Sequence, residues 1–126
     1  MLFRSWPDGP DLLGRLLNAG IDRLAATERF NLIDDAWATT VAGLMPLTDY
    51  LDLTARFTTE EDKNVWAVLL VSFSFLNRII TVEDRSALEA FVRSRVGPTV
   101  TALGWVPRSG ESEGTKIGRA SCRERV

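Results

Sequence analysis

The chain has 126 residues, 45% of them hydrophobic and 25% charged, which is an ordinary globular composition with room for one domain and one core. Its formal net charge of −2 argues against nucleic acid as a partner, because phosphate binding requires a surplus of Lys and Arg. The sequence has no histidine, the commonest general base and a usual zinc ligand, and its single cysteine, Cys122, excludes an internal disulfide.

A first helix is predicted from Pro10 or Asp11 to Asn18, with Gly20 as its stop. A second helix is predicted to have Thr27 as its N-cap, with Glu28 in the first turn, and to end between Gly43 and Pro46. The predicted apolar face of this second helix consists of residues spaced by three and four positions: Phe30, Ile33, Trp37, Val41 and Leu44.

A third helix is predicted to start with Thr48 as its cap. Two sets of residues are candidates for its buried face: Leu51, Thr54 and Phe57, or Tyr50, Leu53 and Phe57. The polar residues 58–63 (TTEEDK) interrupt the pattern, and Asn64 is the predicted cap of a fourth helix that reaches Ile80. Because this fourth helix is apolar on nearly all sides, we expect other helices to surround it.

A fifth helix follows Thr81 and Asp84, whose spacing resembles a capping box. Pro98 should remove one backbone hydrogen bond from this helix and kink it. Residues 104–114 predict a loop, with Ser112 as the cap of a short further helix. The predicted buried side of the fifth helix contains Leu88, Phe91, Val92, Arg95, Val96, Thr99, Val100 and Leu103. The expected fold is all-α, with about five helices in serial antiparallel hairpins, either as a bundle or as a solenoid.

No segment predicts a membrane span or a secretion signal. The most apolar segment, residues 65–76, is interrupted by Ser72 and Ser74 and is shorter than the roughly 20 residues that span a bilayer. Residues 1–10 (MLFRSWPDGP) have no apolar run after Arg4. We therefore expect no membrane partner and a cytoplasmic location.

Acidic pairs and tryptophans are the candidates for chemistry, and each favours a structural role. Asp34 and Asp35 are adjacent on a helix, so their carboxylates point about 100° apart and do not easily share one proton or metal. The run Glu60-Glu61-Asp62 lacks the spacing of a calcium site and favours a solvated loop. Trp37 and Trp66 lie on otherwise aliphatic helix faces, which favours core packing over ligand stacking.

The sequence contains no catalytic constellation. Its serines and threonines lack a histidine or convincing lysine base, and no glycine pattern resembles a phosphate loop. We therefore predict no catalytic, metal-binding or cofactor-binding residue in this chain.

Residues 27–66 (TERFNLIDDAWATTVAGLMPLTDYLDLTARFTTEEDKNVW) resemble the C-terminal helical domain of the zinc metallo-aminopeptidases related to aminopeptidase N. The matching positions are Arg29, NLIDDA at 31–36, Ala42-Gly43, YLDL at 50–53, Val65-Trp66, and GWVPRSGESEGT at 104–115. In that family a stack of helix pairs caps the catalytic domain and bounds the peptide cavity. A His-Glu-x-x-His helix and a further Glu hold the zinc, and none of those motifs occurs here.

The resemblance implies that residues 6–115 are a non-catalytic fragment of such a cap, a right-handed, HEAT-like stack of helix pairs. Its partners would be the catalytic domain of the same polypeptide and, in the parent enzyme, a peptide substrate. Zinc would belong to the parent enzyme and not to this chain. The alternative is a free-standing helical adaptor that binds a partner protein.

The two ends of the chain are predicted to come from sequencing adapters and not from the native protein. Residues 117–126 can be read from the codons ATC GGA AGA GCG TCG TGT AGG GAA AGA GTG, the read-through of a common short-read sequencing adapter. Residues 1–5 (MLFRS) can be read from the inner end of the paired adapter. We therefore expect residues 1–5 and 116–126 not to be native, and residues 116–126 to be disordered. We expect the remaining fragment to be marginally stable and to self-associate.

Overall fold

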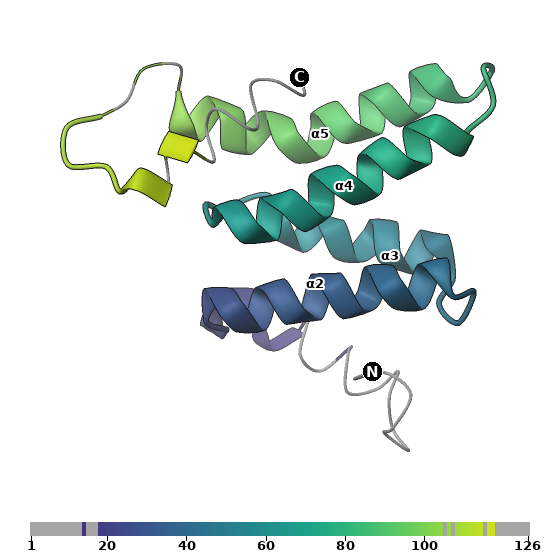
Figure 1. Ribbon diagram of the computed structural model, residues 1–126, viewed down its shortest axis with the longest axis horizontal. Helices are drawn as coiled ribbons and strands as arrows, with labels where there is room; N and C mark the ends of the chain where they lie inside the picture. The colour runs from purple at the N-terminus through teal and green to yellow at the C-terminus, as the bar shows by residue number, and fades with distance from the viewer. Residues whose placement is uncertain (1–13, 15–17, 105, 107, 115, 118–126) are drawn as a thin grey trace. The chain divides into compact units, whose positions relative to one another are not determined.

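The computed structural model describes residue 14, residues 18–104, residue 106, residues 108–114 and residues 116–117. Over these residues it contains four α-helices of eight or more residues, two short 3-10 helices and no strand (Figure 1). The prediction of an all-α chain is confirmed. Most of the first predicted helix lies outside the described residues. The backbone contacts divide the chain into two compact units, residues 1–56 and residues 57–126, which are described separately.

The first unit contains the 3-10 helix η1 (Ile21–Arg23) and two α-helices, α2 (Ala26–Val41) and α3 (Leu47–Thr54). The two α-helices lie side by side and run in opposite directions, as a five-residue connection favours (Figure 1). The fully or almost fully buried side chains of this pair come from both helices: Leu32, Ile33, Ala36, Tyr50 and Leu53. The predicted helical hairpin is therefore present in this unit.

The predicted apolar face of α2 is wrong at its C-terminal end. Val41 is 58% exposed and Leu44 is 54% exposed. The helix ends at Val41, and Gly43 adopts a φ of 73°, a left-handed conformation that a glycine accepts at low cost. Because the chain leaves the helix there, Leu44 no longer continues the helical spacing that the sequence pattern assumed.

Both helices of the first unit begin earlier than predicted. The N-cap of α2 is Ala25, whose backbone N–H donates to Glu28 Oε2 at 2.7 Å, so Thr27 lies inside the helix. The N-cap of α3 is Pro46, whose φ of −58° suits a helix start, so Thr48 also lies inside. Of the two candidate faces of the third helix, the one with Tyr50, Leu53 and Phe57 is buried, together with Thr54.

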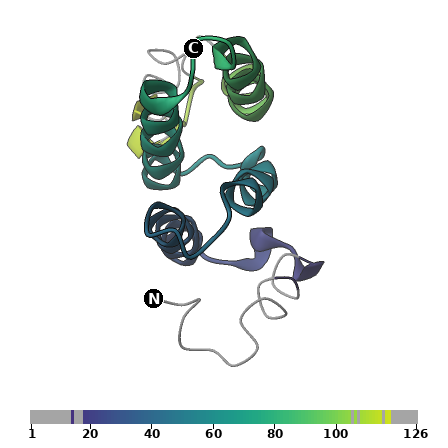
Figure 2. The same cartoon turned by 90° about the vertical axis from the view of Figure 1, so that its right-hand side faces the viewer.

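The second unit begins at the end of the 3-10 helix η2 (Ala55–Phe57) and contains α4 (Lys63–Ile79) and α5 (Arg85–Leu103). These helices form a second antiparallel pair, which Figure 2 shows nearly end-on. The rings of Phe73 and Phe91 meet edge to face with their centroids 5.9 Å apart. The hydroxyl of Thr99 donates to the carbonyl oxygen of Thr58 at 3.0 Å and so joins α5 to the segment before α4.

The predicted buried side of α5 is confirmed. Four of its eight residues are buried and the other four are half-buried; the buried ones are Leu88, Val96, Thr99 and Leu103. The helix continues past Pro98 to Leu103, and the kink expected there stays a prediction. At its start, the hydroxyl of Thr81 bonds to Asp84 Oδ2 at 2.8 Å, so the two residues pair, although the helix itself begins only at Arg85.

The expectation that other helices surround α4 is wrong on one side. Its buried residues include Val65, Trp66 and Leu69, whereas Val71, Phe75 and Ile79 are 53%, 40% and 64% exposed. The helix is therefore apolar on two sides, of which the described structure buries only one. None of the described helices has the length and apolar content needed to cross a membrane.

Asp62, rather than Asn64, is the N-cap of α4. Its Oδ1 accepts the backbone N–H of Asn64 at 2.8 Å and that of Val65 at 3.2 Å, and its negative charge lies at the positive end of the helix dipole. We expect Asp62→Ala to lower the free energy of unfolding by about 1 kcal/mol, measured by urea denaturation. Asp62→Asn keeps the acceptor and should change it by only a few tenths of that amount. Equal losses in both variants would contradict this assignment.

Candidate functional site

Glu60, in the segment before α4, differs most clearly from what the sequence predicts. Glu60, predicted to lie in a solvated loop, is only 5% exposed. Its Oε1 accepts the backbone N–H groups of Glu61 at 3.0 Å and Asp62 at 2.8 Å. Because a buried carboxylate is tolerated only when hydrogen bonds satisfy it, these two donors explain its position.

Trp66 completes this cluster from the first turns of α4. Its side chain is 2% exposed, and its indole N–H donates to the carbonyl oxygen of Glu60 at 2.8 Å. The predicted core role of Trp66 is confirmed. The cluster of Glu60, Asp62 and Trp66 thus fixes how the chain enters α4, and the Glu60 carboxylate accepts backbone N–H groups there.

The remaining sequence candidates belong to α2 in the first unit. Asp34 is exposed and Asp35 is half-buried on α2. Trp37 is half-buried, and its ring centroid lies 5.0 Å from that of the fully buried Tyr50. Among the residues that the structure describes, no three His, Cys, Asp or Glu side chains come close enough together to hold a metal ion.

Several hydroxyl groups on the helices donate hydrogen bonds to backbone carbonyl oxygens. The hydroxyls of Thr39 and Thr40 donate to the carbonyl oxygens of Asp35 and Ala36 at 2.7 and 2.8 Å. Ser72 and Ser94 donate in the same way to carbonyls three residues earlier, at 2.7 and 2.6 Å. A backbone carbonyl oxygen is not a general base, so these hydrogen bonds do not activate the four hydroxyls as nucleophiles.

A groove of about 660 Å³ lies between α4 and α5 in the second unit. Its apolar lining includes Leu70, Phe73, Leu88, Val92 and Val96, and its polar lining includes Asn77, Glu89 and Arg93. Sequence reasoning did not pair these polar residues. Asn77 lies on α4, whereas Glu89 and Arg93 lie on α5, and the antiparallel arrangement of the two helices brings all three to one groove. The groove offers an apolar contact surface with one acid and one base, and no group that would perform chemistry.

The family model of the ERAP1-like C-terminal domain matches residues 9–124. Glutamyl aminopeptidase of Rattus norvegicus is 30% identical over 114 residues, which are 88% of this chain and 12% of that protein. Aminopeptidase M1-A of Oryza sativa subsp. japonica is 29% identical over 93 residues, which are 71% of this chain and 11% of that protein.

Aminopeptidase 2 of Candida albicans is 26% identical over 95 residues, which are 72% of this chain and 10% of that protein. The chain thus spans only about 12% of the length of the first relatives that it matches. No solved structure matches it significantly. Since the family model covers nearly the whole chain, and the relatives match over most of it, the chain belongs to the family of ERAP1-like C-terminal domains.

Proposed function

We propose that this chain is a non-catalytic part of the C-terminal helical domain of a zinc-dependent aminopeptidase. The observation that carries the proposal is the family match over residues 9–124, together with relatives that are named aminopeptidases and extend far beyond the matched segment. The zinc, the catalytic groups and the peptide-binding groups would come from the rest of the same polypeptide, and peptides would be its substrates.

The structure supports a scaffolding role for the described residues. The carboxylate of Glu60 and the hydroxyls of Thr39 and Thr40 bond to the backbone, so these groups serve the fold. Two antiparallel helix pairs follow one another along the chain, which is the arrangement from which solenoids are built. We therefore propose that successive pairs stack in the right-handed, HEAT-like manner and bound the peptide cavity of the parent enzyme.

The isolated chain, supplied with zinc, should not release amino acids from aminoacyl-coumarin amides above the background rate. The reason is that zinc catalysis requires ligands on the protein, and the sequence has no histidine. Fluorescence of the released coumarin measures the rate, and full-length rat glutamyl aminopeptidase in the same buffer is the positive control. Turnover of the chain that scales with its concentration would contradict the proposal.

Reading the source DNA upstream of the fragment separates this proposal from the adaptor alternative. An open frame that contains a His-Glu-x-x-His helix is the expected result. In that full-length protein, deletion of the segment that corresponds to residues 18–104 should abolish peptide hydrolysis. A complete upstream frame without the zinc motif would instead support the free-standing adaptor.

We also propose that the protein is cytoplasmic and that residues 1–5 and 116–126 are not native. The cytoplasmic location is supported by the cysteine count, since the one cysteine, Cys122, lies in the proposed non-native tail and residues 6–115 need no disulfide. The second statement rests on the codon reading of both ends. Sequencing the source DNA with different adapters should replace both ends. Retention of both ends would refute the proposal that they are not native. The family match continues to residue 124 and favours retention of the C-terminal end.

A further inference from the structure

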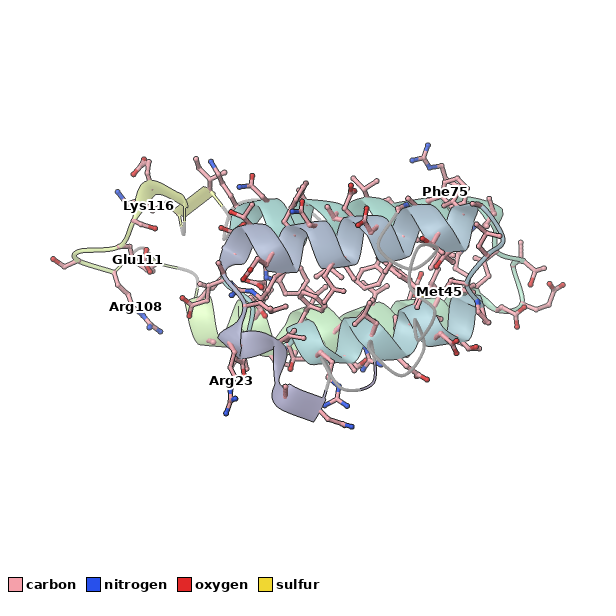
Figure 3. All side chains as sticks on the ribbon, turned by 90° about the horizontal axis from the view of Figure 1, so that it is seen from below. Arg23, Met45, Phe75, Arg108, Glu111 and Lys116 are labelled. Atoms are coloured by element: carbon pink, nitrogen blue, oxygen red, sulfur yellow. The ribbon has the colours of Figure 1, made fainter. Side chains whose placement is uncertain are left out.

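We draw no further inference here: the strongest candidate, the groove between α4 and α5, carries nothing, because its charged lining residues, Glu89 and Arg93, are exposed and nothing in the structure shows what covers either this groove or the exposed apolar side of α4 that includes Phe75 (Figure 3).

Discussion

Trp66→Ala should lower the free energy of unfolding by about 3–5 kcal/mol, the usual cost of truncating a fully buried aromatic side chain. Trp66 is 2% exposed and is the largest fully buried side chain among the described residues. The substitution would leave a cavity beside the first turns of α4 and remove the indole donor from the Glu60 carbonyl. Denaturation by urea, followed by circular dichroism at a wavelength that reports helix content, measures the change.

Trp66→Phe separates the two contributions. It keeps most of the apolar contact but removes the indole N–H, and so leaves the Glu60 carbonyl oxygen, which accepts that N–H at 2.8 Å, without this donor. We expect a loss of about 0.5–1.5 kcal/mol, the usual net contribution of one hydrogen bond. Val82→Ala, at a residue that is 80% exposed, is the control and should change stability by less than about 0.5 kcal/mol. A Trp66→Ala variant as stable as this control would disprove the assigned role.

Helix periodicity predicted α5 well because the sequence records which side of that helix is buried. Residues from Leu88 to Leu103 repeat at spacings of three and four, and the structure buries that side. The same rule places the end of the buried face of α2 wrongly, because the spacing of apolar residues does not show where a helix ends. The positive φ of Gly43 ends that face before Leu44.

The starts of α2, α3 and α4 are predicted two residues late, because several residues that can serve as caps lie near each start. The choice among them depends on hydrogen bonds that form in three dimensions. Glu28 reaches back to the N–H of Ala25, and Asp62 reaches forward to the N–H groups of Asn64 and Val65. A carboxylate three residues inside a helix was the available signal for α2, since capping boxes place Glu there.

The burial of Glu60 was beyond sequence reasoning. A run of three acidic residues between helices is ordinarily solvated, and composition alone gives no reason to bury one of them. The exception depends on two backbone N–H groups aimed at one carboxylate oxygen and on an indole placed over the same residue's carbonyl. Two of these contacts lie within residues 60–62, and the third, from the Trp66 indole, requires the first turns of α4.

The function was readable only through the family resemblance, for a chemical reason. The sequence of a scaffolding helix mainly records which side of it is buried. Among the described residues, hydroxyls such as those of Thr39 and Thr40 and the carboxylate of Glu60 bond to the backbone and point to no reaction. The uniformly apolar sequence of α4 illustrates the limit. Its apolar residues on nearly all sides predict that other helices surround it, whereas the structure distinguishes a buried side with Trp66 and Leu69 from an exposed side with Phe75.

Tyr50→Ala should be the most damaging single truncation in the first unit. Tyr50 is fully buried, and its ring lies 5.0 Å from that of Trp37 at an angle of 47°, so it fills the space between α3 and α2. We expect a loss of about 3–5 kcal/mol in the free energy of unfolding, measured by urea denaturation with circular dichroism as the readout. This is a large part of the stability of an ordinary small domain, about 5–15 kcal/mol.

Tyr50→Phe is the matched control because it keeps the ring and most of the volume. It should cost no more than about 1.5 kcal/mol, the contribution of one hydroxyl hydrogen bond. The difference between the two variants then measures the packing of the ring against α2. The double variant Trp37→Ala/Tyr50→Ala should lose less stability than the sum of the two single losses, since the effects of residues in contact are not additive. Strict additivity of the two losses would show that the rings do not stabilise one another, and equal losses in Tyr50→Phe and Tyr50→Ala would contradict a packing role for the ring.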